Sequence, residues 1–241
     1  MATIGLIVFI ALYFVEAGYG YLFNPKFGRP ISNKVGWVVM EAPAFLSMLI
    51  WSCTAKETQI PQLALAALFL LHYFQRSFIF PFLMQGRSMI PAGIVLMGVF
   101  FNLINANIQG AWLFHIAPTE FYSNWFSQPY FWIGSLIFLV GMAINLHSDS
   151  IVRHLRQAGD TAHHIPHGGM FRYVSSANYF GEITEWAGFA IACWSWSGAL
   201  FLWWTFANLA PRSASLYKRY QSEFGTSFTS LRRKRIIPFI Y

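Results

Sequence analysis

The chain has 241 residues, of which 56% are hydrophobic, 19% are aromatic and only 10% are charged. Soluble domains carry about 25% charged residues, so this composition excludes a disordered chain, a coiled coil and an ordinary soluble α/β enzyme. The net charge of +7 does not indicate a nucleic-acid-binding protein, because the basic residues lie between apolar blocks and in the C-terminal tail. The composition therefore indicates an integral membrane protein.

Several apolar segments are long enough to cross a hydrocarbon core, which takes about 20 helical residues. Five spans are predicted from such segments, at about 3–23, 35–53, 60–83, 89–109 and 129–147. A longer apolar block follows at about 178–210, and we expect it to form two helices joined by a tight turn near 194–198. Together these segments predict seven transmembrane helices.

Lysine and arginine indicate the orientation, because they concentrate in cytoplasmic loops. They follow the first, third and fifth spans and recur in the tail, for example in the run Arg232-Arg233-Lys234-Arg235. The loop after the fourth span contains neither residue. The pattern predicts an all-α, multi-pass membrane protein with its N-terminus outside and its C-terminus in the cytoplasm.

Polar side chains inside the predicted spans are costly in lipid, so each one is a functional hypothesis. Asn178, Glu182 and Glu185 share one helix face, and Asn145 shares a face with Asp149. Hydrogen bonding between helices would account for any one such residue, but two carboxylate-bearing stripes together favour a polar cavity open to the cytoplasm. Further polar residues of this kind lie in the first three spans, namely Glu16, Glu41, His72, Tyr73 and Arg76.

Two familiar classes of site are not indicated. The sequence contains neither a P-loop nor a glycine-rich dinucleotide fingerprint after a strand, so any nucleotide has to be bound by the helical bundle itself. His163, His164 and His167 form a single histidine cluster on a glycine-flanked loop. Because membrane di-iron enzymes surround their metals with several such clusters, we predict no metal site.

Three motifs together resemble the steroid 5α-reductase family: Asn145-Leu-His-Ser-Asp149, Ile165-Pro-His-Gly-Gly-Met-Phe171 and Ala177-Asn-Tyr-Phe-Gly-Glu-Ile-Thr-Glu-Trp186. Shorter similar stretches lie at 18–20, 71–77, 86–87 and 237–241. The similarity covers nearly the whole chain in order and is closest to the type 2 branch of that family. A bacterial homologue is one interpretation of this resemblance.

The resemblance implies a membrane enzyme that uses NADPH to reduce the C4–C5 double bond of 3-oxo-Δ4-steroids. It implies a single seven-helix domain over 1–241, with a substrate side at about 1–110 and an NADPH side at about 129–241. Tyr73 and Glu41 correspond to the pair that activates the 3-oxo group, and Arg156 is the residue we expect at the 2′-phosphate, with His164 second. The implied cofactor positions are Tyr19, Arg87, Asn145, Asp149, Arg156, His164, Asn178, Glu182, Arg212 and Tyr220.

Three residues depart from the family pattern. Met40 stands where a glutamine usually precedes the catalytic glutamate, His164 replaces an arginine, and Leu216 replaces a histidine that contacts the cofactor. The expected partners are a 3-oxo-Δ4-steroid entering from the bilayer and membrane lipid, with no nucleic acid and no obligate protein partner. A bacterial inner membrane and an endoplasmic reticulum membrane fit the sequence equally well.

Two alternatives stay open at this point. A membrane methyltransferase of the isoprenylcysteine type has a similar stretch near a late helix, but its Arg-His-Pro is replaced here by Arg172-Tyr-Val-Ser-Ser176. A non-catalytic sterol-binding protein is the other alternative. Use of NADPH or of S-adenosylmethionine would distinguish the two enzymes.

Overall fold

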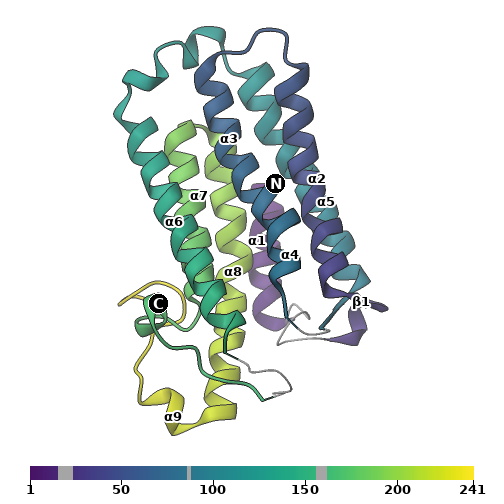
Figure 1. Cartoon of the computed structure of the whole chain (residues 1–241), viewed down its shortest axis with the longest axis vertical. Coiled ribbons are helices and arrows are strands. Elements are labelled where there is room, and N and C mark those ends of the chain that lie inside the picture. The colour runs from purple at the N-terminus through teal and green to yellow at the C-terminus, as the bar shows by residue number, and fades with distance from the viewer. Residues whose placement is uncertain (16–23, 86–87, 156–161) are drawn as a thin grey trace. The chain divides into compact units, whose positions relative to one another are not determined.

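The computed structural model describes residues 1–15, 24–85, 88–155 and 162–241, which are mostly helical (Figure 1). The chain forms two compact units. Unit 1 comprises Met1–Glu16, Ile137–Ala187 and Leu202–Tyr241, and unit 2 comprises Ala17–Leu136 and Gly188–Phe201. The predicted division into a substrate side and a cofactor side stays a prediction.

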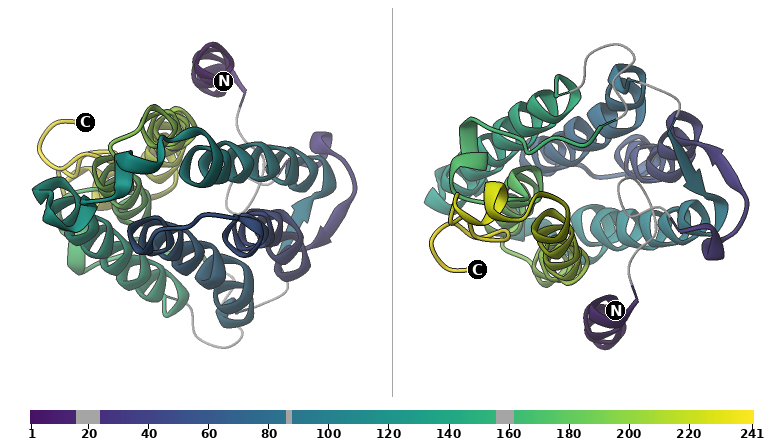
Figure 2. Two further views of the ribbon diagram at one scale, coloured as in Figure 1. Left: turned by 90° about the horizontal axis from the view of Figure 1, so that it is seen from above. Right: turned by 90° about the horizontal axis from the view of Figure 1, so that it is seen from below.

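Unit 2 is built around three helices. Helix α2 (Asn33–Thr54) lies against α5 (Ala92–Ala111) and α3 (Ile60–Phe74), as Figure 2 shows. Helix α3 continues through a π-helical turn at Gln75–Ile79 into α4 (Phe80–Leu83), and α5 continues into a second π-helical turn at Trp112–Ile116. Two short antiparallel strands, β1 (Pro30–Ser32) and β2 (Met89–Pro91), pair with Ile31 opposite Ile90 and so join the beginnings of α2 and α5.

A glycine lets α2 approach α5 closely. A Cβ atom on Gly98 of α5 would collide with the side chain of Met40, so only glycine leaves room for Met40 at this point. Met40 is buried together with Ile90, Ile94 and Val95. The close approach brings the next turn of α5, which carries Asn102, beside the backbone of α2.

Unit 1 contains α1 (Ala2–Phe14), most of α6 (Pro129–Arg153), the first part of α7 (Ala177–Cys193), most of α8 (Trp196–Phe224) and the short α9 (Thr226–Thr229). Helices α6 and α7 meet through glycines. A Cβ atom on Gly181 of α7 would lie 2.5 Å from the backbone nitrogen of Asn145, and one on Gly141 of α6 would collide with the backbone of Glu185. The two polar stripes therefore lie at a close helix–helix contact.

Gly181→Val is expected to separate α6 from α7 and to lower the melting temperature of the detergent-solubilised protein, because overpacking costs about 1–3 kcal/mol or more. The matched control is Ala143→Val, which adds methyl groups to an exposed position of α6. Thermal unfolding followed by circular dichroism measures both variants. Equal melting temperatures for the two variants would show that the contact is not tight.

Among the described residues, four helical segments are long and apolar enough to cross a membrane, namely Asn33–Thr54, Ile60–Leu83, Ala92–Ile116 and Pro129–Arg153. They coincide with the second to fifth predicted spans, and Ala2–Phe14 is a shorter apolar helix at the first. Large apolar side chains are exposed on these segments, including Ile7, Ile50, Phe100 and Leu136. The described structure therefore supports an integral membrane protein, while the count of seven spans and the orientation stay predictions.

The long apolar block is two helices, as predicted. Helix α7 ends at Cys193 and α8 begins at Trp196, and the turn between them includes Trp194 with a positive φ of 46°. Three boundaries differ clearly from the predicted spans. Helix α1 ends at Phe14, with Val15 extended, before the predicted end at about 23. The other two differ because helix formation continues beyond apolar sequence. Helix α6 extends from the predicted end at 147 to Arg153, and α8 extends beyond 210 to Phe224, where Gly225 adopts a φ of 51°.

Candidate active site and cofactor site

Three buried or half-buried polar residues of unit 2 meet between α2, α3 and α5. The Tyr73 hydroxyl donates to Asn102 Oδ1 at 3.0 Å, and Asn102 Nδ2 donates to Glu41 Oε2 at 3.1 Å. Asn102 Nδ2 also donates to the backbone carbonyl of Met40 at 2.8 Å. The structure thus brings the predicted pair, Tyr73 and Glu41, to one amide side chain.

Aromatic packing holds the end of α3 that carries Tyr73. The Tyr73 ring lies 4.6 Å from the Phe69 ring and 5.1 Å from His72, centroid to centroid. In the π-helical turn that follows, the buried Arg76 guanidinium lies 4.9 Å from the centre of the Trp37 ring and 4.7 Å from that of Phe80. These contacts fix the direction of Tyr73 and stabilise a cation inside an apolar unit.

Asn102 was missed by the sequence analysis, although the same argument would have found it. Asn102, Asn105 and Gln109 are buried on one face of α5, inside a predicted span. Gln109 Nε2 donates to Asn105 Oδ1 at 3.3 Å and to the Ser197 carbonyl at 2.9 Å. Amide side chains cost less in lipid than charged ones, so they are a weaker indication of a functional site in the sequence than the carboxylates are.

The two polar stripes of unit 1, one on α6 and one on α7, face each other where these two helices meet. Asn145 Nδ2 donates to the backbone carbonyl of Asn178 at 2.9 Å, and Asn178 Nδ2 donates to Asp149 Oδ1 at 3.3 Å. Asn145 and Asp149 are buried, whereas Asn178 and Glu182, one turn further along α7, are half-buried. Amide and carboxylate groups at a partly open contact are suited to pair with the amide and hydroxyl groups of a ligand.

Helix α8 adds donors to the same unit. The buried Arg212 donates from Nε to the hydroxyl of Tyr179, the residue after Asn178, at 2.6 Å. The pKa of Tyr220 is raised to about 12, chiefly by burial and also by nearby Tyr179, while Arg233 acts in the opposite direction. Tyr220 is therefore a neutral phenol at physiological pH and can donate a hydrogen bond.

The C-terminal tail holds the segment that precedes α7. The backbone nitrogen of Ser175 donates to the Lys234 carbonyl at 2.8 Å, and Arg233 donates to the Pro166 carbonyl at 2.7 Å. Arg233 also donates to Nδ1 of His167 at 3.1 Å, so that ring nitrogen carries no proton. The tail thereby fixes the loop that leads into Asn178.

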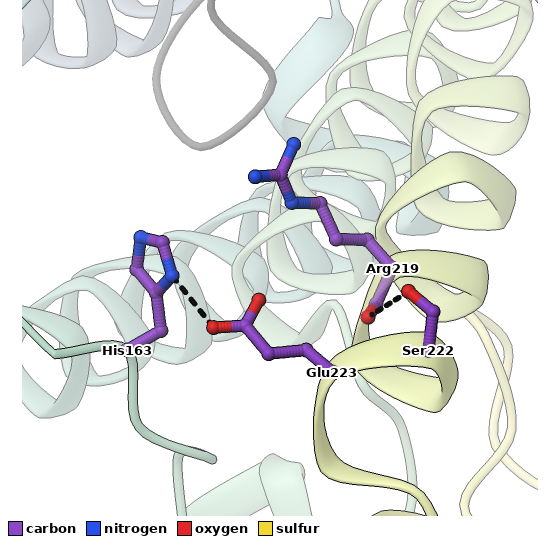
Figure 3. Close-up of polar contacts among 4 residues, drawn as sticks. All are labelled: His163, Arg219, Ser222 and Glu223. Atoms are coloured by element: carbon purple, nitrogen blue, oxygen red, sulfur yellow. Dashed lines mark hydrogen bonds and ion pairs between the residues drawn. The ribbon is translucent and has the colours of Figure 1, made fainter.

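A second contact ties the beginning of this loop to α8. His163 Nδ1 donates to Glu223 Oε1 (Figure 3). The two atoms are 2.8 Å apart, and both side chains are about one-third exposed. Arg219 lies one turn before Glu223 on the same helix. The loop is therefore held by α8 at its beginning and by the tail near its end.

The remaining predicted positions are less informative. Tyr19, Arg87 and Arg156 lie outside the described residues. His164 is exposed on the loop, and Leu216 is half-buried on α8, one turn after Arg212. Among the described residues, no group of three histidine, cysteine or acidic side chains is arranged to hold a metal ion; the absence of a metal site stays a prediction.

The donor set of unit 1 fits a pyridine nucleotide. A nicotinamide carboxamide and ribose hydroxyls need amide and carboxylate partners, which Asn178 and Asp149 provide, and phosphates need a guanidinium such as that of Arg212. The buried hydroxyls of Ser148 and Ser176, which flank these residues in sequence, have no hydrogen-bond partner within the described part of the chain. A bound ligand would supply such partners, since buried polar groups are nearly always satisfied.

Comparison with known proteins identifies the family. The sequence profile of the 3-oxo-5-alpha-steroid 4-dehydrogenase family matches residues 88–241. The chain is 38% identical to 3-oxo-5-alpha-steroid 4-dehydrogenase 1 of Macaca fascicularis, over 92% of this chain and 84% of that protein. It is 37% identical to the protein of that name from Homo sapiens, over 99% and 92% of the two chains. This chain belongs to the 3-oxo-5-alpha-steroid 4-dehydrogenase family.

The family extends to plants: the chain is 36% identical to the steroid 5-alpha-reductase DET2 of Gossypium hirsutum, over 99% of this chain and 93% of that protein. Membership confirms the resemblance drawn from the three motifs and makes the chain a member of an oxidoreductase family. It favours a reductase over the methyltransferase and over the non-catalytic sterol-binding protein. The closer affinity to the type 2 branch stays a prediction.

Proposed function

We propose that this chain is an NADPH-dependent reductase of the C4–C5 double bond of 3-oxo-Δ4-steroids. The observation that carries the proposal is the meeting of Tyr73, Asn102 and Glu41 inside an apolar helical unit, in a chain whose relatives are named for this reaction. A phenol and a carboxyl group in such surroundings are suited to activate a carbonyl oxygen.

The chemistry of an enone explains why such donors are needed. Adding hydride to C5 moves negative charge to the 3-oxo oxygen and forms an enolate, which is then protonated at C4. A donor positioned at that oxygen stabilises the charge as it grows, and one donor of this kind contributes about 10²–10³ in rate. Tyr73 offers its hydroxyl, and Glu41 offers a second donor when its carboxyl holds a proton.

NADPH, when bound, would supply the hydride. We assign its nicotinamide carboxamide and ribose groups to Asn145, Asp149, Asn178 and Glu182. Arg212 and the neutral Tyr220 are suited to its phosphates by charge and by hydrogen bonding. The family resemblance alone assigns the 2′-phosphate to Arg156, with His164 as the second candidate. It also assigns further cofactor contacts to Tyr19 and Arg87.

We propose that the chain crosses the membrane seven times. Seven helices of 13 residues or more among the described residues support this count, namely α1, α2, α3, α5, α6, α7 and α8. The arginines and lysines of the loops and tail support an external N-terminus and a cytoplasmic C-terminus in a bacterial inner membrane or an endoplasmic reticulum membrane. A reporter fused after Tyr241 should behave as cytoplasmic, and an external signal would overturn this orientation.

In this proposal the substrate reaches the protein from the bilayer, because a sterol-sized apolar molecule partitions into lipid. No partner protein and no nucleic acid are required. Consumption of NADPH by the purified protein with a panel of 3-oxo-Δ4-steroids tests the function, with a saturated 3-oxo-steroid as the control. Steroid-dependent oxidation of NADPH is the expected result. Transfer of a methyl group from S-adenosylmethionine, or no reaction with any enone, would overturn the proposal.

A further inference from the structure

Asn102 is the residue that joins the two groups proposed to activate the substrate. It is only 4% exposed and contacts Tyr73, Glu41 and the Met40 carbonyl at 2.8–3.1 Å. A single amide therefore touches a side chain of α3 and both a side chain and the backbone of α2. Neither its position nor its role is explained by cofactor binding, since it belongs to none of the predicted cofactor positions.

The partners of Asn102 fix the direction of its amide. A backbone carbonyl only accepts hydrogen bonds, so the group facing the Met40 oxygen has to be Nδ2. The oxygen Oδ1 then faces Tyr73, and because an amide oxygen only accepts, the Tyr73 hydroxyl has to donate to it. The hydrogen that Tyr73 would offer to a substrate is thus held by Asn102.

We propose that Asn102 is a positioning residue for the reduction, an inference that depends on the proposed function. It holds Glu41 through Nδ2, and it provides through Oδ1 the resting partner of the Tyr73 hydroxyl. As negative charge develops on the 3-oxo oxygen, that oxygen becomes the stronger acceptor, since hydrogen bonds to ionised groups are about twice as strong as neutral ones. The Tyr73 hydroxyl then stops donating to Asn102 Oδ1 and donates to the 3-oxo oxygen of the substrate instead.

This exchange makes the hydrogen bond from Tyr73 to the substrate stronger in the transition state than in the ground state. Only interactions that strengthen in this way accelerate the chemical step. A competing neutral acceptor of the hydroxyl serves that purpose, because it weakens donation to the neutral carbonyl and gives way to the enolate. If Asn102 were only an interhelical link between α2 and α5, its removal would change stability but not the strength of the bond to the carbonyl.

The test uses two variants of nearly the same shape and one matched control. Asn102→Leu removes the competing acceptor. Asn102→Asp keeps it: the carboxyl oxygen that replaces Nδ2 faces the Met40 carbonyl and Glu41 and has to hold a proton, while the other oxygen still accepts from Tyr73. The control is Asn105→Leu, the same change at an equally buried amide one turn along α5 that contacts Gln109 instead. The measurements are kcat, KM, NADPH affinity, and the infrared stretch of a C3-labelled 3-oxo-Δ4-steroid bound with NADP⁺.

For Asn102→Leu we expect kcat to fall about 10-fold or more, as when a catalytic group loses its positioning. KM for the steroid should not rise and the carbonyl stretch should move to lower frequency, because Tyr73 then donates fully in the ground state. For Asn102→Asp the acceptor for Tyr73 is kept, so KM and the carbonyl stretch should stay close to those of the wild type and kcat should fall less than in Asn102→Leu. NADPH affinity should change less than twofold in both variants.

A lower carbonyl frequency in Asn102→Leu, with a wild-type frequency in Asn102→Asp, would support the exchange and would not follow from a structural role. If the leucine variant does not fold, Asn102→Ala, which also removes the acceptor, still has to show the lower frequency. An active wild type whose Asn102 variants match Asn105→Leu would overturn this inference alone. A wild type that reduces no enone would overturn the proposed function and this inference with it.

Discussion

Tyr73→Phe is expected to lose turnover of a 3-oxo-Δ4-steroid by about 10²-fold or more, as for other donors that act in the transition state. The change removes one hydroxyl and its hydrogen bond to Asn102 but little volume, so α3 and its packing against Phe69 should survive. NADPH affinity should stay nearly normal, since Tyr73 is not among the predicted cofactor positions. Steady-state kinetics and a cofactor titration measure the two effects separately.

The control for Tyr73→Phe is Tyr122→Phe, which removes a hydroxyl from an equally buried tyrosine of unit 2. The Tyr122 hydroxyl donates to the Cys193 carbonyl at 3.2 Å and accepts from Trp112 at 2.9 Å. It has no proposed role in the reaction, so this variant should lose some stability and little turnover. Near-normal turnover of Tyr73→Phe would rule out its assignment as the donor.

Glu41→Gln should lower turnover by a similar factor, because the amide keeps the shape of the carboxyl group but loses its acidic proton. The double variant with Tyr73→Phe should lose little beyond the worse single variant, since the members of one catalytic unit are not additive. Independent, multiplying losses would show that the two residues act at different steps. Asn102 contacts both groups, which is the physical reason to expect strong coupling.

The helices and much of the site follow from local patterns in the sequence. Length of apolar sequence predicts a membrane helix directly, and helical spacing places Asn145 with Asp149 and Asn178 with Glu182 on common faces. That these two faces meet follows from Gly141 and Gly181, whose missing side chains let α6 approach α7. Glycine in a helix has several roles, so sequence alone does not assign it this one.

The tail is the part that local patterns do not predict. Arg233 contacts Pro166 across 67 residues, and the isolated bridge from Val174 to Lys234 spans a similar separation. Nothing in the run from Arg232 to Arg235 distinguishes the buried arginine from its exposed neighbour. A basic run next to a span predicts orientation, but which of its members turns inward is decided by tertiary packing.

Arg233→Met is expected to weaken NADPH binding about 10- to 100-fold, with kcat at saturating NADPH little changed. The substitution keeps much of the buried chain length but removes the hydrogen bonds to the Pro166 carbonyl and to His167. Hydrogen bonds to a charged group are worth about 1.5–3 kcal/mol, and a Pro166 carbonyl left without its donor inside the unit favours movement of the loop. That loop leads through 173–176 into Asn178. Movement of the loop should therefore displace Asn178 and lower the affinity for NADPH.

The matched control is Arg232→Met, the same change at the preceding residue, whose side chain is exposed. Removing an exposed charge should leave NADPH affinity within about twofold, since exposed charges contribute little to binding or stability. Burial lowers the pKa of Arg233, and nearby Tyr220 partly offsets this by raising it. The Arg233 guanidinium is nevertheless charged, so both substitutions remove one positive charge and differ only in the buried contacts that are lost. Titration of NADPH by fluorescence compares the two variants, and equal losses of affinity would mean that the tail acts through its net charge rather than through the buried contact of Arg233.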